Sequence, residues 1–177
     1  MNKVRIATTW LDGCSGCHMS FLDIDETLAA VADRIEIVYG PLVDAKEFPD
    51  GVDVTLVEGA VGNVHDREEL KRIRERTHIL ISFGDCAVTA NVPAMRNQFK
   101  VQDVLKRGYV DNVSHNPAVP NVGVPKLLER ARPLHEFVAV DVFLPGCPPP
   151  SEAILLALTD LLEGRTPEVQ GKTRFGA

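Results

Sequence analysis

Short apolar runs alternate with amphipathic stretches along this chain of 177 residues. Runs rich in apolar and β-branched residues predict five buried strands, at residues 4–9, 35–38, 52–57, 78–83 and 137–144. Helical spacing of apolar positions predicts three helices, at residues 19–33, 66–76 and 151–163, with Gly164 as the cap of the last one. Strands that alternate with helices are typical of a parallel sheet with helices on its faces.

The predicted fold is therefore α/β, a flavodoxin-like, doubly wound parallel sheet of five strands. One segment departs from the alternation, because more than fifty residues separate the fourth and fifth strands. Within it, residues 108–133 carry four prolines, two glycines and three asparagines. Long segments of this kind are usually functional or disordered. We expect a long irregular insertion there, either a docking place for a partner or a plain surface excursion.

The chain has the length of one domain, which we place at residues 1–164 and follow with a polar tail at residues 165–177. Its formal net charge is −6 and it contains no basic run, so nucleic acid and anionic membranes are not expected partners. No apolar stretch is long enough to span a bilayer, and the start shows neither a signal peptide nor a twin-arginine leader. We expect a cytoplasmic protein. Thiols stay reduced in the cytoplasm, so its cysteines are expected to bind metal or to act in catalysis rather than to form disulfides.

All four cysteines follow predicted strands. Cys14 and Cys17 come after the first strand, Cys86 after the fourth and Cys147 after the fifth. The carboxyl ends of parallel strands converge on one crevice, so these thiolates can meet there. Four thiolates around one point suit zinc or an iron–sulfur cluster.

The spacing of the cysteines leaves alternatives open. A C-x-x-C at a strand-to-helix turn is also typical of a redox dithiol, but that interpretation leaves Cys86 and Cys147 unexplained. A structural zinc site usually takes two short C-x₂₋₄-C knuckles, whereas the second pair here is split between distant loops. A pair plus two single cysteines favours a cubane cluster, in which each cysteine holds one iron corner.

Four motifs carry a family resemblance: W-L-D-G-C-S-G-C-H-M-S-F-L-D at 10–23, V-E-G at 57–59, G-D-C-A at 84–87 and L-P-G-C-P-P-P at 144–150. Together they resemble the small subunit of a nickel–iron hydrogenase. The short chain without extra cysteines resembles the soluble, NAD-reducing (bidirectional) type.

The resemblance implies one [4Fe–4S] cluster, proximal to a nickel–iron centre in a separate large subunit. Cys14, Cys17, Cys86 and Cys147 each match a ligand position of the family. The chain would be an electron relay without catalytic residues of its own. Its partners would be the large subunit and iron–sulfur/flavin (diaphorase) subunits, which would hold FMN, further iron–sulfur clusters and NAD.

The chain also departs from related patterns. Ala90-Asn91 stands where many relatives have a glycine pair. The similar cluster subunit of respiratory complex I has two adjacent cysteines, whereas Ser15 and Gly16 separate them here. A complex I-like subunit therefore remains an alternative, as does a stand-alone flavodoxin-like module that binds flavin or zinc.

Polar residues near the crevice are candidates for a supporting role. Glu58 ends the third strand at the cysteine edge, where it could approach the cluster, relay a proton or face solvent. His18 follows Cys17 and could donate to a cluster sulfur or lie in water. Asp85 could cap a turn and receives no chemical role. Trp10 and Phe83 are expected to wall off the site by packing. The other histidines show no ligand spacing and are expected to be structural or exposed: His65, His78, His115 and His135.

Overall fold

The computed structural model describes residues 3–176. Its main sheet has five parallel strands in the order β2-β1-β3-β5-β7. These strands are β1 (Val4–Trp10), β2 (Ile35–Tyr39), β3 (Val52–Glu58), β5 (Thr77–Phe83) and β7 (Val142–Leu144). Counted along the chain, this is the flavodoxin-like order, so the predicted fold class is confirmed. The first four predicted strands agree with the structure to within one residue.

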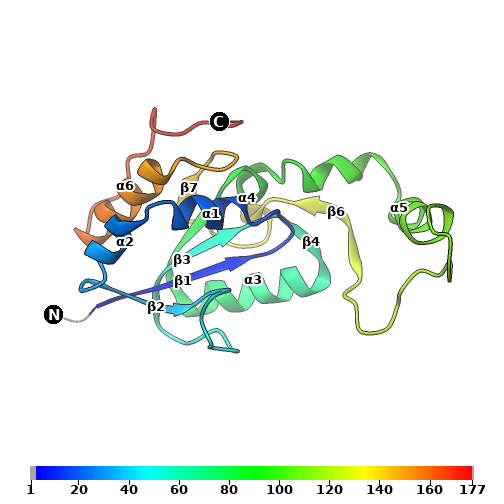
Figure 1. Ribbon diagram of the computed structural model, residues 1–177, viewed down its shortest axis with the longest axis horizontal. Helices are drawn as coiled ribbons and strands as arrows, with labels where there is room; N and C mark the ends of the chain where they lie inside the picture. Colours follow the sequence, from blue (N-terminus) through cyan, green and yellow to red (C-terminus); the bar gives the residue numbers. More distant parts are fainter. Residues whose placement is uncertain (1–2, 177) are drawn as a thin grey trace.

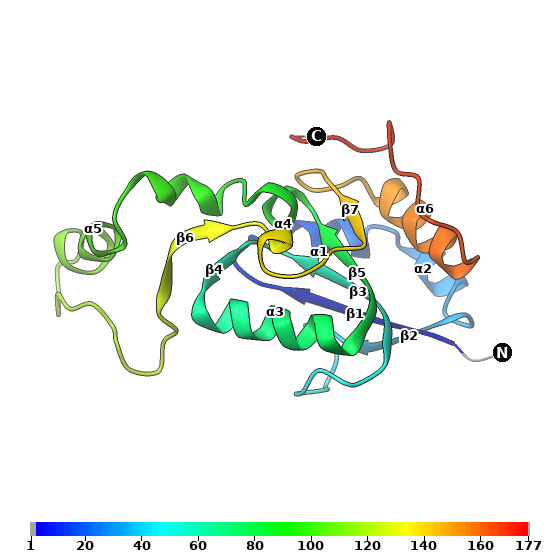
Figure 2. The same ribbon diagram turned by 180° about the vertical axis from the view of Figure 1, so that it is seen from behind.

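Helices cover both faces of the sheet (Figures 1 and 2). One face carries α1 (Gly16–Leu22), α2 (Glu26–Ala30) and α6 (Ser151–Leu162), and the other carries α3 (Val64–Arg76). Each face has its own apolar core, because successive side chains of a strand point to opposite faces. Buried members of the first core include Ile6, Leu56, Ile81 and Ile154, and those of the second include Val57, Leu70, Ile73 and Leu80.

Two predicted elements are wrong in extent. The helix expected at residues 19–33 is two short helices, because the backbone of Asp25 takes a positive φ of 53° between them. Aspartates favour turns over helix interiors, and this segment contains Asp23 and Asp25. The fifth strand is also shorter than the predicted range 137–144. Val138 and Val140 pack against the second core from an irregular segment, and an apolar run alone does not distinguish such a segment from a strand.

The segment between β5 and β7 contains more regular structure than the irregular insertion expected from the sequence. It begins with the short helix α4 (Asp85–Thr89) and continues through η1 (Pro93–Gln98), α5 (Val101–Lys106) and the π-helical turn η2 (Arg107–Asp111). It returns through β6 (Leu127–Arg132), which pairs antiparallel with β4 (Val61–Asn63), and through η3 (Leu134–Glu136). Neither β4 nor β6 was predicted.

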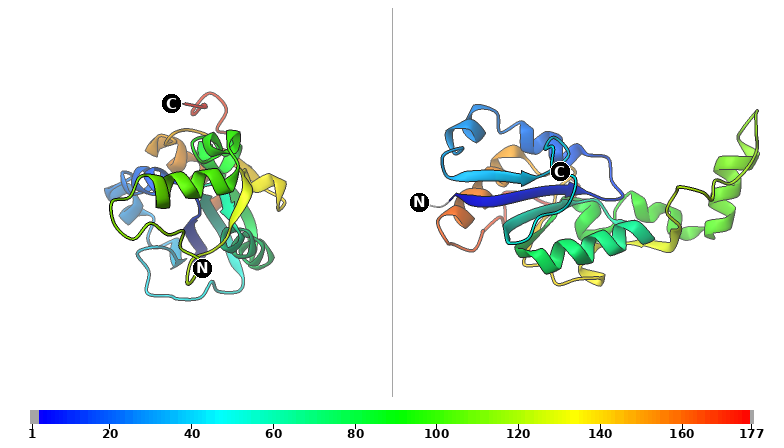
Figure 3. Two further views of the ribbon diagram at one scale, coloured as in Figure 1. Left: turned by 90° about the vertical axis from the view of Figure 1, so that its right-hand side faces the viewer. Right: turned by 90° about the horizontal axis from the view of Figure 1, so that it is seen from below.

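Residues 92–126 of this segment, here called the arm, project away from the body formed by the sheet and the helices on its two faces (Figures 1 and 3). The arm is held at its base by Asn97, whose side chain exchanges two 2.8 Å hydrogen bonds with the backbone of Ala131. Arg96 adds a 2.9 Å hydrogen bond to the carbonyl of Gly62. Beyond this base, residues 111–126 are all exposed.

The tail that starts at residue 165 lies against the body as far as it is described. Arg165 pairs with Asp160 of α6, and Val169 packs against the first core. The boundary between a domain at 1–164 and a tail at 165–177 stays a prediction, and Ala177 lies outside the described residues. Among residues 3–176, no helix combines the length and the hydrophobicity that crossing a bilayer requires.

Candidate metal centre

The four cysteines lie in three loops at the carboxyl edge of the sheet. Cys14 follows β1, Cys17 lies in the first turn of α1, Cys86 lies in α4 after β5, and Cys147 follows β7. All four are free thiols. Cys17 is buried and Cys86 half-buried, whereas Cys14 and Cys147 are exposed. The topology therefore brings all four cysteines to the same edge of the sheet, as the sequence predicts.

The thiols are close enough to influence one another's ionisation. Burial raises the pKa of Cys17 well above its ordinary value, and the charges of Glu58 and of the other three cysteines raise it further. Burial also raises the pKa of Cys86 to about 11, although a hydrogen bond from the backbone of Val92 opposes the rise. The pKa of Cys147 is raised too, mainly by burial and then by the charge of Asp85. Thiols with pKa values raised in this way stay protonated at neutral pH unless a bound metal stabilises the thiolate form.

Glycines allow the backbone to approach the sulfur atoms. Gly84 has a φ of +83°, and a Cβ atom there would clash with Cys17 Sγ. A Cβ atom at Gly16 would lie 3.3 Å from Cys14 Sγ. Within the described residues, no three His, Cys, Asp or Glu side chains converge as one metal ion requires. The donor set, all sulfur and spread over three loops, fits a multi-iron cluster.

Glu58 and His18 form a buried pair behind the cysteine loops. Glu58 is 1% exposed, so the solvent-facing interpretation of this carboxylate is wrong. Its Oε2 lies 2.5 Å from His18 Nδ1 and accepts a 3.1 Å hydrogen bond from the His18 amide. His18 is buried rather than exposed to water, between Trp10 and Phe83, with ring centroids 5.1 Å and 6.1 Å away. The pair fixes the first turn of α1, which carries Cys17.

Two polar residues matter more than the sequence indicated. Asp85 is 3% exposed, and its Oδ1 accepts a 2.7 Å hydrogen bond from the amide of Gly146, next to Cys147. Asn91 donates from Nδ2 to Cys147 Sγ at 3.8 Å. The signal for Asp85 was its place beside Cys86 at the end of a buried strand. The signal for Asn91 was the departure at Ala90-Asn91, and Ala90 indeed takes the positive φ, 65°, that favours glycine.

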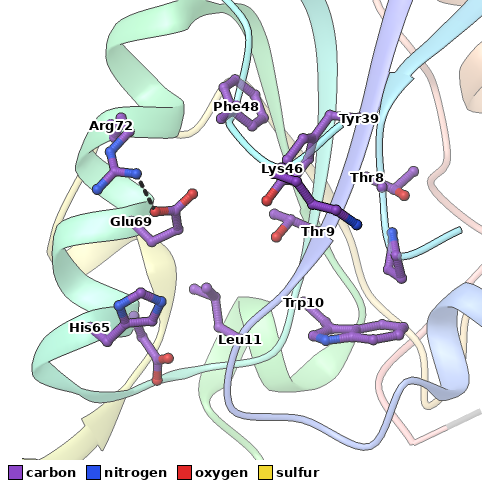
Figure 4. Close-up of a pocket in the computed structure, with 13 residues that line it drawn as sticks. Thr8, Thr9, Trp10, Leu11, Tyr39, Lys46, Phe48, His65, Glu69 and Arg72 are labelled. Carbon is purple, nitrogen blue, oxygen red and sulfur yellow. Dashed lines mark ion pairs between the residues drawn. The ribbon is translucent and has the colours of Figure 1, made fainter. Parts of the chain in front are cut away.

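A separate pocket of about 400 Å³ opens between the ends of β1 and β2 and helix α3 (Figure 4). Its lining mixes aromatic, hydroxyl and charged groups, among them Thr9, Trp10, Lys46, His65 and Arg72. None of the four cysteines lines it. The remaining histidines considered above are all exposed: His65, His78, His115 and His135.

Comparison with known proteins defines the class of this chain. The family model described as "NADH ubiquinone oxidoreductase, 20 Kd subunit" matches residues 14–161. The chain therefore belongs to this family.

Individual relatives narrow the class. The chain is similar to the delta subunit of the NAD-reducing hydrogenase HoxS of Cupriavidus necator, with 40% identity over 168 residues, 92% of this chain and 80% of the relative. It is also 39% identical to a subunit of the F420-non-reducing hydrogenase vhu of Methanocaldococcus jannaschii, covering 96% of this chain but only 59% of that relative. These similarities confirm the resemblance to the small subunit of an NAD-reducing [NiFe]-hydrogenase.

Solved structures agree. A chain of an NAD+-reducing [NiFe]-hydrogenase in the H2-reduced state superposes with a TM-score of 0.94 and 42% identity, covering 98% of this chain and 99% of that one. A chain of the [NiFeSe]-hydrogenase of Dm. baculatum gives a TM-score of 0.59 at 17% identity, covering 99% of this chain and 70% of that one. This second likeness shows the shared fold alone.

Proposed function

We propose that this chain is the electron-transfer small subunit of a cytoplasmic, NAD-reducing [NiFe]-hydrogenase. In this proposal Cys14, Cys17, Cys86 and Cys147 hold one [4Fe–4S] cluster. The observation that carries the proposal is the gathering of four free thiols, from three strand-end loops, at one edge of the sheet. The hydrogenase names of relatives 39–40% identical to the chain support it.

The cluster would supply one-electron chemistry, and the residues of this chain would hold it and adjust its potential. Hydrogen bonds to sulfur, burial and local charge are the means by which a protein does so. Asn91 lies beside Cys147 Sγ as a donor, and Cys17 is buried. The buried pair of Glu58 and His18 would support the cluster from behind.

Partner subunits would provide the rest of the reaction. A large subunit with the nickel–iron centre would exchange electrons with the cluster on one side. Diaphorase subunits with FMN, further iron–sulfur clusters and NAD would continue the path on the other. The support is the match to a chain of an NAD+-reducing [NiFe]-hydrogenase over 98% of this chain.

Metal analysis of the full chain, purified without oxygen, tests this function. We expect iron and acid-labile sulfide in equal amounts and a brown chromophore that bleaches on reduction. Cys86→Ala should remove most of the iron and sulfide. Val122→Ala, an 88% exposed position on the arm, is the control and should retain both. A colourless wild-type protein with zinc and no sulfide would overturn the proposal.

A further inference from the structure

The tail crosses the loop that carries Cys147. Thr173 Oγ1 donates a hydrogen bond to the carbonyl of Pro145, and the amide of Gly176 donates to Asp85 Oδ2 at 2.8 Å. The tail is anchored at its other end, where the Arg165 guanidinium pairs with Asp160 of α6. Between these contacts, Val169 packs on the core. These contacts thus hold the tail against α6, the core, Asp85 and the loop of Cys147.

Asp85 connects the tail to both single-cysteine loops. Its amide donates to the carbonyl of Gly146 at 2.9 Å, while its Oδ1 accepts from the Gly146 amide at 2.7 Å. The Gly84 amide adds a 2.8 Å hydrogen bond to the carbonyl of Leu144. The loop of Cys86 and the loop of Cys147 are therefore joined by a reciprocal pair of hydrogen bonds, centred on a buried carboxylate.

The second oxygen of that carboxylate depends on the tail. Asp85 is 3% exposed, and its Oδ2 is bonded to Gly176. A buried carboxylate oxygen that loses its donor is strongly disfavoured. Withdrawal of the tail would therefore leave Asp85 short of a partner and favour its turning toward water. That movement would release the amide of Gly146, the residue before Cys147.

The fit between tail and loop is close. Gly146 has a φ of +134°, and a Cβ atom there would lie 2.9 Å from Thr173 Oγ1 and 2.5 Å from Pro149 Cα. Only glycine combines this backbone conformation with the space left by Thr173. Cys147 itself is exposed, so its own side chain contributes little packing to fix the loop. The loop takes its position from its neighbours.

We propose that residues 169–176 are a clasp that positions the Cys147 loop through Asp85 and Thr173. Cys147 would then be preorganised as a ligand, and retention of the cluster would depend on the tail. This inference rests on the proposed function only in treating Cys147 as a ligand, because the clasp itself is defined by hydrogen bonds. Thr173 and Asp85 are positioning residues that act through the loop.

Three variants of the full chain test the clasp. Thr173→Val removes one hydroxyl at nearly constant shape. Truncation after Val169 removes both tail contacts. Asp85→Asn replaces one acceptor oxygen by a donor amide, so that Gly146 and Gly176 cannot both be satisfied. Thr166→Val is the matched control, because Thr166 is an exposed threonine of the same tail without a side-chain hydrogen bond within the described residues.

Two readouts are measured on each protein, prepared without oxygen. The first is hydrogen exchange at the amide of Gly146, which should become about tenfold faster on truncation, as expected for the weakening of one hydrogen bond to a charged group. The second is the rate of iron release to a chelator together with the cluster's midpoint potential. Truncation and Asp85→Asn should release iron several-fold faster and shift the potential, Thr173→Val less so, and Thr166→Val should match the wild type.

The outcomes separate the two proposals. Unchanged exchange at Gly146 in the truncated chain would overturn the clasp, whatever the metal content. Faster exchange with unchanged iron release and potential would also overturn it, because the loop would move without affecting the cluster. A wild-type chain without iron or sulfide would overturn the proposed function instead, and exchange at Gly146 would then decide whether the tail holds the loop.

Discussion

The cysteine loops and the arm both leave the carboxyl side of the sheet, yet they are held very differently. Buried polar groups fix the loops, with Glu58 against His18 and Asp85 against Gly146. The arm is pinned near its base by Asn97 and carries exposed apolar side chains beyond it, among them Phe99 (62% exposed) and Val122 (88%). Charge differs as well, since residues 92–126 contain five Lys or Arg and two Asp in a chain of net charge −6.

This contrast shows which parts of the fold are held rigidly by buried contacts and which are not. In the proposed role, the four cysteines would have to be held to a fraction of an ångström as ligands of one centre, and buried hydrogen bonds between their loops suit that need. An element that projects from the body gains little burial from its own chain and depends on a few contacts at its root. The two regions should therefore respond differently to the same kinds of perturbation.

Limited proteolysis should show the largest difference. We expect the first cuts within residues 111–126, which are all exposed, while the body stays intact. The loop at 41–51 is the comparison, because it is also largely exposed but is anchored by the buried side chain of Phe48 and by a hydrogen bond from Arg76 to the Phe48 carbonyl. Cleavage of the arm should be at least roughly a hundredfold faster, since opening it costs little compared with global unfolding. Mass spectrometry of early fragments identifies the sites. First cuts within 41–51 would contradict the contrast.

Glu58→Ala should give the next largest effect, on the cysteine side. The change removes the acceptor of both His18 hydrogen bonds and leaves buried donors unpaired. Urea unfolding should show a loss of about 3 kcal/mol, the low end of what breaking a buried pair costs. Glu36→Ala, an exposed glutamate on β2, is the control and should change stability by less than about 0.5 kcal/mol. Equal losses for the two variants would show that the buried pair is not special.

Asn97→Ala tests the root of the arm. It removes both hydrogen bonds to Ala131, so we expect a loss of about 2 kcal/mol that is concentrated at the arm. Faster hydrogen exchange at the Ala131 amide and faster cleavage of residues 111–126 would report it. Gln98→Ala, whose side chain bonds only to Met95 three residues away among the described residues, is the control. Unchanged exchange at Ala131 would show that other contacts hold the arm.

Asp141, where the segment returns to β7, should give the smallest effect. Burial alone would raise its pKa, but hydrogen bonds from the Leu80 amide and from Arg74, with the Arg74 charge, bring the pKa below its ordinary value. The ionised form therefore stabilises the fold above the unfolded pKa of about 3.9, and this gain disappears as pH falls through the lower folded pKa. In urea unfolding, the free energy of unfolding of the wild type should exceed that of Asp141→Asn by the same amount at pH 7 and at pH 5.5. The gap should close below about pH 4, and a gap that widens there would contradict the assignment.

The sequence predicted the parts of the molecule that depend on local patterns. Buried strands and cysteines placed just after them are short-range signals, and the parallel topology turns them into a common edge. The capped helix α6 also followed from its apolar spacing and Gly164, whose φ is +71°. The ligand role of the cysteines stays a prediction, although the family resemblance is confirmed.

What the sequence did not predict depends on partners distant along the chain. The hydrogen-bond partner of the buried Glu58 is His18, forty residues away in the sequence. The partners of Asp85, Gly146 and Gly176, are more distant still. The small sheet of β4 and β6 consists of short strands whose pairing spans the whole arm. Neither hydrophobic periodicity nor motif spacing reports contacts of this range.

The position of β7 has a consequence for biosynthesis. It is the last strand of the main sheet along the described chain and forms an edge of that sheet, directly before Cys147. A nascent polypeptide on the ribosome can thus present Cys14, Cys17 and Cys86 well before the fourth thiol has emerged from the exit tunnel. In the proposed role, iron and sulfide delivered during translation would meet only three of the four cysteine ligands. Assembly of the cluster must therefore wait until Cys147 has emerged.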